Sequence, residues 1–112
     1  MAEQLVPIFK VSDADRAAAW YARLGFTKDF EQRYSEEFPA YVGVSRNGMA
    51  IHLSERLGDA TPDSLAYLYV DNVDDLASEF DVAVKDVGEA MEIHLTDLDG
   101  NRLRIGARKL TP

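Results

Sequence analysis

The chain contains no cysteine, and among its 112 residues it has one tryptophan, two histidines and four prolines. The lack of cysteine excludes a disulfide framework, a thiolate metal site and a cysteine nucleophile. The first four residues carry an acid where a secretory signal would carry positive charge, and no apolar run approaches the roughly 20 residues that a membrane span needs. We therefore expect a cytoplasmic protein that does not bind membranes.

Basic residues are also scarce, since twelve Lys and Arg face twenty Asp and Glu and leave a net charge of −8. This surplus repels phosphate backbones, so nucleic acid is not an expected partner. It attracts cationic small molecules or partners, although solubility alone requires a similar surplus. The charge therefore favours a cationic ligand without identifying one.

The first half of the chain has the pattern of a strand, a helix and three more strands. Residues 5–11 are mostly apolar and β-favouring, and Ser12, with Asp15 three residues later, has the pattern of a helix N-cap. Gly25 supplies a left-handed residue to end the helix, and Asn47–Gly48 predicts a hairpin turn. One apolar stripe runs along the helix at Ala17, Trp20, Tyr21 and Leu24. The three further strands are predicted at about 26–33, 40–46 and 49–54.

The second half repeats this order after a turn-rich stretch at 55–64 that reads as a linker. A strand at 65–70 leads to a helix that Asp71 or Asn72 can cap, with the same apolar spacing at Val73, Leu76, Ala77 and Phe80. Strands follow at about 81–87, 91–96 and 101–107, with a turn at Asp99–Gly100. Because Ile51–Leu53 also echoes Ile93–Leu95 (both read Ile-His-Leu), a duplication is the economical explanation.

The predicted organisation is one α+β domain of residues 1–112. A βαβββ module at about 4–55 and a second one at about 65–108 flank a linker at about 56–64. With 46% hydrophobic residues, a chain of this length can bury its own core.

Strand alternation separates the predicted strands into two faces. The core face is expected to carry Phe9, Val11, Val42, Val44, Ile51, Leu53, Ala66, Leu68, Val70, Ile93, Leu95, Leu103 and Ile105. The opposite face is expected to carry Lys10, Tyr41, Ser45, His52, Ser54, Tyr67, Tyr69, Glu92, His94, Arg102 and Arg104. This mixture of aromatic and polar groups is typical of a ligand-lining surface, although the solvated side of an antiparallel sheet alternates in the same way.

Four short motifs, taken in their order and spacing, resemble the glyoxalase/bleomycin-resistance/dioxygenase superfamily, which is also called the vicinal-oxygen-chelate superfamily. They are Val11–Asp13 after the first strand, Tyr21–Phe26 at the helix end, Val70–Val73 at the second crossing and Asp97–Leu103 in the last hairpin. The resemblance covers about Leu5 to Ala107. It implies two tandem βαβββ modules that form a curved, cup-shaped mixed β-sheet with the helices on the outside.

The resemblance also implies where a metal ion would be held. Metal-dependent members place His or Glu on the first and last strand of each module, and the corresponding positions here are Val6, His52, Leu65 and Arg104. Only His52 among them can coordinate a divalent ion, and Arg104 would repel one. An atypical site in which Glu92 and His94 join His52 is the alternative. The resemblance is therefore closest to the metal-free bleomycin-resistance branch, with no metal and no cofactor expected.

That branch implies a homodimer that sequesters a cationic aromatic antibiotic of the bleomycin type. No nucleophile motif or phosphate loop is found, so no catalytic residue is predicted. Trp20 is a further candidate for stacking on the ligand, and the segment with Phe30, Phe38 and Glu36–Glu37 is expected to reach the second subunit. A metal-dependent lyase, isomerase or dioxygenase, or a non-catalytic module for a metabolite or a protein, are the alternatives. The expected ligand-binding residues are Phe38, Tyr41, His52, Tyr67, Tyr69, Glu92, His94 and Arg104.

Overall fold

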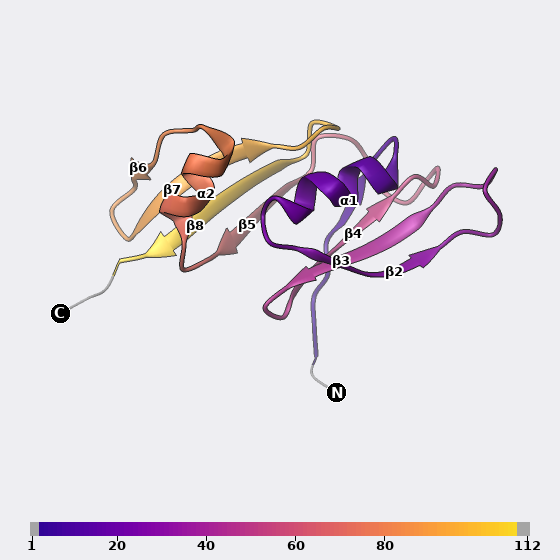
Figure 1. Ribbon diagram of the computed structural model, residues 1–112, viewed down its shortest axis with the longest axis horizontal. Coiled ribbons are helices and arrows are strands. Elements are labelled where there is room, and N and C mark those ends of the chain that lie inside the picture. The colour runs from indigo at the N-terminus through magenta and orange to yellow at the C-terminus, as the bar shows by residue number, and fades with distance from the viewer. Residues whose placement is uncertain (1–2, 110–112) are drawn as a thin grey trace. The chain divides into compact units, whose positions relative to one another are not determined.

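The computed structural model describes residues 3–109. The chain divides into two compact units. Unit 1 is the chain up to Ser64 together with Asp97–Asn101, and unit 2 is Leu65–Thr96 with the chain from Arg102 onward. Each unit has one helix and one four-stranded sheet (Figure 1). The expected α+β fold of two tandem βαβββ modules is confirmed, and the mixed sheet is present as two sheets, one in each unit.

Unit 1 contains a sheet with the strand order β1-β4-β3-β2. Strand β1 pairs with β4 in parallel, and the other pairs are antiparallel. Asn47 and Gly48, with φ of 48° and 84°, supply the two left-handed residues that a two-residue hairpin turn requires between β3 and β4. The elements are β1 (Ile8–Lys10), α1 (Ala14–Ala22), β2 (Thr27–Gln32), β3 (Tyr41–Arg46) and β4 (Met49–Ser54).

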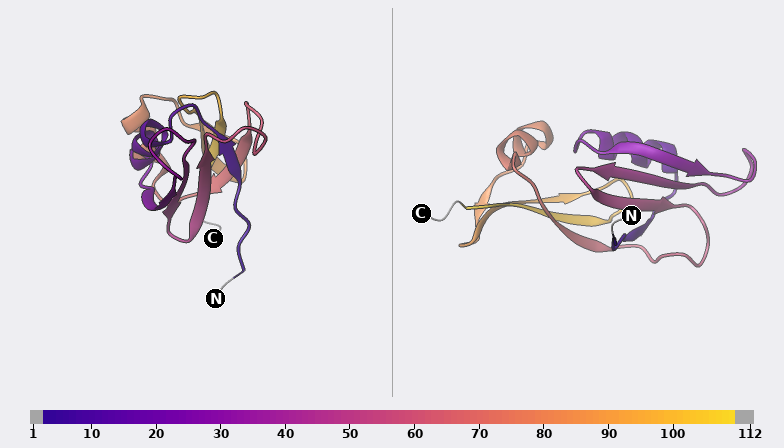
Figure 2. Two further views of the ribbon diagram at one scale, coloured as in Figure 1. Left: turned by 90° about the vertical axis from the view of Figure 1, so that its right-hand side faces the viewer. Right: turned by 90° about the horizontal axis from the view of Figure 1, so that it is seen from below.

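Helix α1 packs its apolar stripe on the sheet of unit 1 (Figure 2). All four predicted stripe residues are buried. Trp20 is only 8% exposed and its ring meets the Tyr21 ring edge-on at 4.8 Å between centroids, so the expectation that Trp20 stacks on a ligand is wrong. The predicted cap at Ser12 is also wrong. Asp13 is the N-cap, because its extended backbone lets the carboxylate accept from the backbone N–H groups of Asp15 and Arg16.

Unit 2 contains a sheet with the strand order β5-β8-β7-β6, with β5 parallel to β8. The strand predicted at 81–87 shrinks to two residues. Asp81 takes a left-handed φ of 53° and the Val82 N–H donates to the Ala77 carbonyl. The start of this segment therefore forms the C-terminal cap of the helix instead of a strand. The elements are β5 (Leu65–Tyr69), α2 (Val73–Phe80), β6 (Lys85–Asp86), β7 (Ala90–Thr96) and β8 (Arg102–Arg108). Helix α2 packs on β7 and β8.

The aliphatic side chains predicted for the core are buried, apart from Ala66 and Val70, which are half-buried. The sequence echo between Ile51–Leu53 and Ile93–Leu95, however, joins strands that are not equivalent. Residues 51–53 lie on β4, the fourth strand of unit 1, whereas 93–95 lie on β7, the third strand of unit 2. The counterpart of β4 is β8, because each pairs in parallel with the first strand of its unit.

The Asp97–Asn101 turn belongs to the core of unit 1. The Tyr21 hydroxyl donates to the Asp97 carboxylate at 2.8 Å, and the Asn101 amide donates to the same carboxylate and to the Lys10 carbonyl. Burial raises the pKa of the Tyr21 hydroxyl far above its ordinary value, and the charge of Asp97 is the second largest cause. The Asp-x-Asp-Gly-Asn motif therefore stabilises the fold. In the part of the chain that the structure describes, neither helix is long and apolar enough to cross a bilayer.

Candidate functional site

In each unit the helix covers one face of the sheet, and we call the other face the open face. Most predicted ligand-binding residues lie on an open face: Tyr41 and His52 in unit 1, and Tyr67, Tyr69, Glu92, His94 and Arg104 in unit 2. Phe38 does not. It lies in the loop between β2 and β3, half-exposed, with its ring against Tyr34 at 5.4 Å between centroids.

The open face of unit 1 carries a cluster of rings. The Tyr41 hydroxyl and the His52 Nδ1 atom lie 2.7 Å apart. The Phe30 ring meets the His52 ring edge-on at 5.2 Å between centroids and lies nearly parallel to the Tyr41 ring at 6.3 Å. The Arg56 guanidinium lies 5.1 Å from the centre of the Tyr41 ring. The three rings together form a half-buried aromatic surface, which we call the aromatic cluster.

Gly43 on β3 makes the aromatic cluster possible. It pairs with Phe30 on β2 and with His52 on β4. A Cβ atom at Gly43 would lie 2.1 Å from the Phe30 ring, so only glycine lets that ring cross β3 toward His52. The sequence prediction missed Phe30 as a site residue. A glycine in the interior of a predicted strand was the available signal for such a close approach.

Burial keeps the aromatic cluster uncharged at neutral pH. It lowers the pKa of His52, although the charge of Asp29 opposes this effect. Burial, followed by the charge of Asp59, raises the pKa of the Tyr41 hydroxyl. A neutral imidazole that accepts the Tyr41 proton at Nδ1 keeps a hydrogen on Nε2, which can donate to a ligand.

The open face of unit 2 carries a hydrogen-bonded network instead. The Tyr67 hydroxyl donates to one oxygen of Glu92 at 2.7 Å, and His94 Nε2 lies 2.7 Å from the other oxygen. The hydrogen bond from Tyr67 is the main cause that lowers the pKa of Glu92, and the hydrogen bond from His94 is the second. The same bond to Glu92 is the main cause that raises the pKa of Tyr67 to about 12. Glu92 is therefore an anion at neutral pH, although it is only 7% exposed.

Gly106 has the role in unit 2 that Gly43 has in unit 1. Tyr67 lies on β5 and Glu92 on β7, and β8 runs between these strands. A Cβ atom at Gly106 of β8 would lie 2.3 Å from the Tyr67 hydroxyl oxygen. The bare glycine therefore lets Tyr67 reach across β8 to the Glu92 carboxylate.

The open face of unit 2 is basic, in contrast to the whole chain. On the exposed sides of β5, β7 and β8, Glu92 is the one carboxylate, against Arg102, Arg104 and Arg108. The Arg108 guanidinium lies 4.2 Å from the centre of the Tyr69 ring. A pocket of about 100 Å³ lies beside the other two arginines and is lined by Leu65, His94, Leu95, Thr96, Arg102, Leu103 and Arg104.

These open faces do not fit the metal site of the superfamily's enzymes. The residue on β1 in register with His52 is Ile8, and the residue on β5 in register with Arg104 is Tyr67, whereas Leu65 pairs with Arg102. This set offers one imidazole, a tyrosine hydroxyl that stays protonated and a permanent cation. Between residues 3 and 109, no three His, Asp or Glu side chains are grouped so that they could hold a metal ion.

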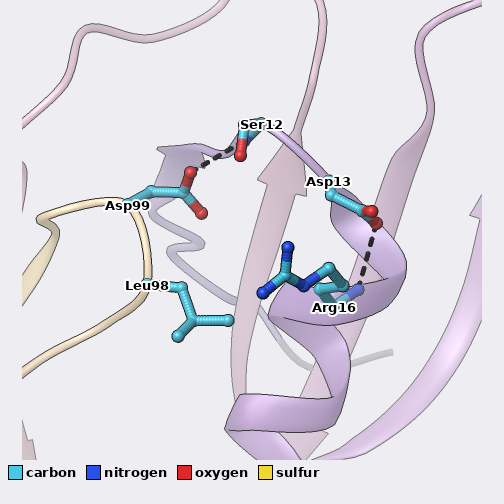
Figure 3. A pocket seen from close by; sticks show the side chains of 5 residues that line it. All are labelled: Ser12, Asp13, Arg16, Leu98 and Asp99. Carbon is cyan, nitrogen blue, oxygen red and sulfur yellow. Dashed lines mark hydrogen bonds between the residues drawn. The ribbon is translucent and has the colours of Figure 1, made fainter.

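A second pocket, of about 130 Å³, lies at the start of α1 (Figure 3). It is lined by Ser12, Asp13, Arg16, Leu98 and Asp99. The Asp99 carboxylate accepts from the Ser12 N–H at 2.9 Å, and the Asp13 carboxylate accepts from the Arg16 N–H at 3.1 Å. Both acids in this pocket therefore hold the local fold, and we place the candidate site on the open faces.

A protein-family model described as "Glyoxalase superfamily protein" matches residues 1–109. The fold is similar to that of a bleomycin resistance determinant encoded on the transposon Tn5, with 20% identity and a TM-score of 0.76 over 97% of this chain and 100% of that one. It is similar to TnmS3, an antibiotic binding protein from a Streptomyces species, with 22% identity and a TM-score of 0.75 over 97% and 99%.

A lactoylglutathione lyase from Agrobacterium tumefaciens is also similar, with 14% identity and a TM-score of 0.73 over 96% of this chain and 94% of that one. No curated protein matches the chain. At these identities the likeness concerns the fold, which antibiotic-binding proteins and an enzyme share.

Proposed function

The chain belongs to the glyoxalase superfamily, and we propose that within it this protein is a metal-independent cytoplasmic binder of small molecules that sequesters an aromatic antibiotic of the bleomycin type. The aromatic cluster of unit 1 is the observation that carries the proposal. Phe30, Tyr41 and His52 present half-buried rings and hydrogen-bonding groups on an open face. Such a surface suits a flat heteroaromatic ligand, since rings stack and the polar tips orient it.

The charge around the aromatic cluster favours a ligand with a cationic part. Asp29 lies close enough to act on the charge of His52, and Asp59 acts on Tyr41. Asp59 also accepts a hydrogen bond from the Ser54 hydroxyl at 2.7 Å, which fixes its carboxylate. A cationic group beside a stacked ring would therefore be attracted by the carboxylates of Asp29 and Asp59, while the Arg56 guanidinium over the Tyr41 ring opposes them.

A homodimer is part of the proposal. Several large apolar side chains are exposed, among them Leu5, Tyr34, Phe38 and Leu57. Exposed apolar groups of this kind support burial against a second copy of the chain. Sedimentation of the purified protein over a range of concentrations tests this, and a monomer at every concentration contradicts it.

Calorimetric titration with metal-free bleomycin, with and without a chelator, tests the function. We expect the same affinity in both conditions. Tyr41→Ala should weaken binding about tenfold or more, because a lost stacking and hydrogen-bonding contact is worth roughly 1–2 kcal/mol. Val87→Ala is the control for the loss of exposed apolar surface, because that side chain is 50% exposed and belongs to unit 2, outside the aromatic cluster of unit 1.

Two results would count against this function. If the wild-type protein does not bind bleomycin, the proposed ligand class is wrong. If binding requires one equivalent of a divalent ion, metal independence is wrong and a metal-dependent enzyme becomes the better hypothesis.

A further inference from the structure

The open face of unit 2 holds two arginines whose guanidinium groups have no hydrogen-bond or ion-pair partner among the described residues. Arg102 and Arg104 are two residues apart on β8, so their side chains leave the same face about 7 Å apart. Within residues 3–109, neither guanidinium makes a hydrogen bond or an ion pair. Two like charges side by side repel each other, and the chain as a whole has eight more acids than bases.

Glu92 is the carboxylate on the same open face, and both of its oxygens already have hydrogen-bond partners. Arg104 pairs in register with His94, two residues from Glu92 on β7. Both oxygens of Glu92 are bound, one by the Tyr67 hydroxyl and the other by His94. Glu92 therefore acts on Arg104 only as a distant charge, and the guanidinium donors of both arginines stay available.

The surroundings of the two arginines suit an anionic group attached to an apolar body. The pocket of about 100 Å³ has room for a group of a few atoms, and Thr96 adds a hydroxyl to its lining. Leu65 and Tyr67, which pair in register with Arg102 and Arg104 on the neighbouring strand, are both about half-exposed. Guanidinium groups match the planar carboxylate with paired hydrogen bonds.

From this placement we propose that Arg102 and Arg104 bind the carboxylate of a small organic acid, whose apolar body rests on Leu65 and Tyr67. The inference rests on the proposed function only in that it assigns a small-molecule ligand to an open face. It gives unit 2 a charge preference opposite to that of unit 1, and it does not require one molecule to occupy both faces.

Three probes with the same ring and different charge test the site: 2-naphthoate, 2-naphthylmethanol and 2-naphthylmethylammonium. We expect naphthoate to bind about tenfold or more tightly than the alcohol, because charge-assisted hydrogen bonds to arginine are roughly twice as strong as neutral ones. The ammonium probe should bind to this face most weakly. Raising the salt concentration should weaken naphthoate binding, since the pair is partly exposed.

Single variants locate the site. Arg102→Gln and Arg104→Gln should each reduce naphthoate affinity about tenfold and shift the NMR signals of Leu65 and Tyr67 less on titration. Arg108→Gln is the matched control, because it removes the same charge from the same strand, where the guanidinium lies on the Tyr69 ring outside the pocket. It should leave the affinity within about twofold. Thermal melts establish that all three variants are folded.

The outcomes separate this inference from the proposed function. Equal binding of the three probes, tighter binding of the ammonium probe, or an equal loss in Arg108→Gln each overturns the carboxylate site while leaving bleomycin binding at Tyr41 to stand. Failure of all three probes also overturns it. Displacement of naphthoate by inorganic phosphate at lower concentration than by acetate would reassign the two arginines to a phosphate group.

Discussion

In unit 1 the Phe30 ring crosses Gly43 to reach His52, and in unit 2 the Tyr67 side chain crosses Gly106 to reach Glu92. Both units therefore use a bare glycine so that an aromatic residue spans a strand on the open face. The resulting surfaces differ, because one is a cluster of uncharged rings and the other is a charged network next to two arginines that have no ion pair within residues 3–109. Two sheets with the same strand order can thus share the use of a glycine at this position while their open faces differ in chemistry.

The core sides of the same strands differ much less. Ile51 and Leu53 flank His52 on β4, and Leu103 and Ile105 flank Arg104 on β8, with all four aliphatic residues buried. Packing under a helix restricts these positions to aliphatic side chains of similar volume. The open-face position between them is not restricted in this way, so it can hold an imidazole in one unit and a guanidinium in the other.

Each unit also pairs a tyrosine hydroxyl with a carboxylate, Tyr21 with Asp97 in the core and Tyr67 with Glu92 on an open face. We expect Asp97→Ala to lower the free energy of unfolding by about 3 kcal/mol, because it leaves buried donors of Tyr21 and Asn101 without an acceptor. Glu92→Ala should cost clearly less, since Tyr67 is 43% exposed whereas Tyr21 is fully buried. Urea unfolding measures both. An equal loss of unfolding free energy in the two variants would contradict this difference between the Tyr21–Asp97 and Tyr67–Glu92 pairs.

The two glycines provide the second comparison. Gly43→Ala and Gly106→Ala should each destabilise the fold by about 1 kcal/mol, because a side chain must move away from the new methyl group. Gly43→Ala should weaken bleomycin binding and leave naphthoate binding unchanged, whereas Gly106→Ala should do the reverse. Ser45→Ala on β3 serves as the control for a small side-chain change on the same face of the same strand. If one glycine variant weakens both ligands, the open faces do not act separately.

The smallest expected effect is on the titration of Tyr67. In Glu92→Gln the pKa of Tyr67 should fall from about 12 toward its ordinary value of about 10, as measured by ultraviolet absorbance. Because the folded-state pKa is raised, the Tyr67–Glu92 bond stabilises the fold fully below about pH 10, and this contribution is lost as the pH rises through about 12. Tyr41 is the internal control, since burial is the main cause of its raised pKa. An unchanged Tyr67 pKa would contradict the network.

Local patterns were enough to predict the order of elements in both units. The apolar stripe of α1 and the Asn47–Gly48 turn each depend on residues that are close together in sequence, so local patterns are enough to predict them. Alternation likewise placed Tyr41, His52 and Arg104 on the side away from the helices. The strand predicted at 81–87 is only two residues long, because residues 81–84 form the exit from α2, which competes with strand propensity.

Contacts between neighbouring strands could not be predicted from local patterns, and they decide the chemistry of the open faces. The strand order brings Phe30 to His52 and Tyr67 to Glu92 across a third strand, and among the described residues it leaves Arg102 and Arg104 without an ion pair. Side-chain alternation repeats every two residues and carries no information about which strand lies alongside. Backbone pairing between segments far apart in sequence supplies that information, and it exists only in the folded chain.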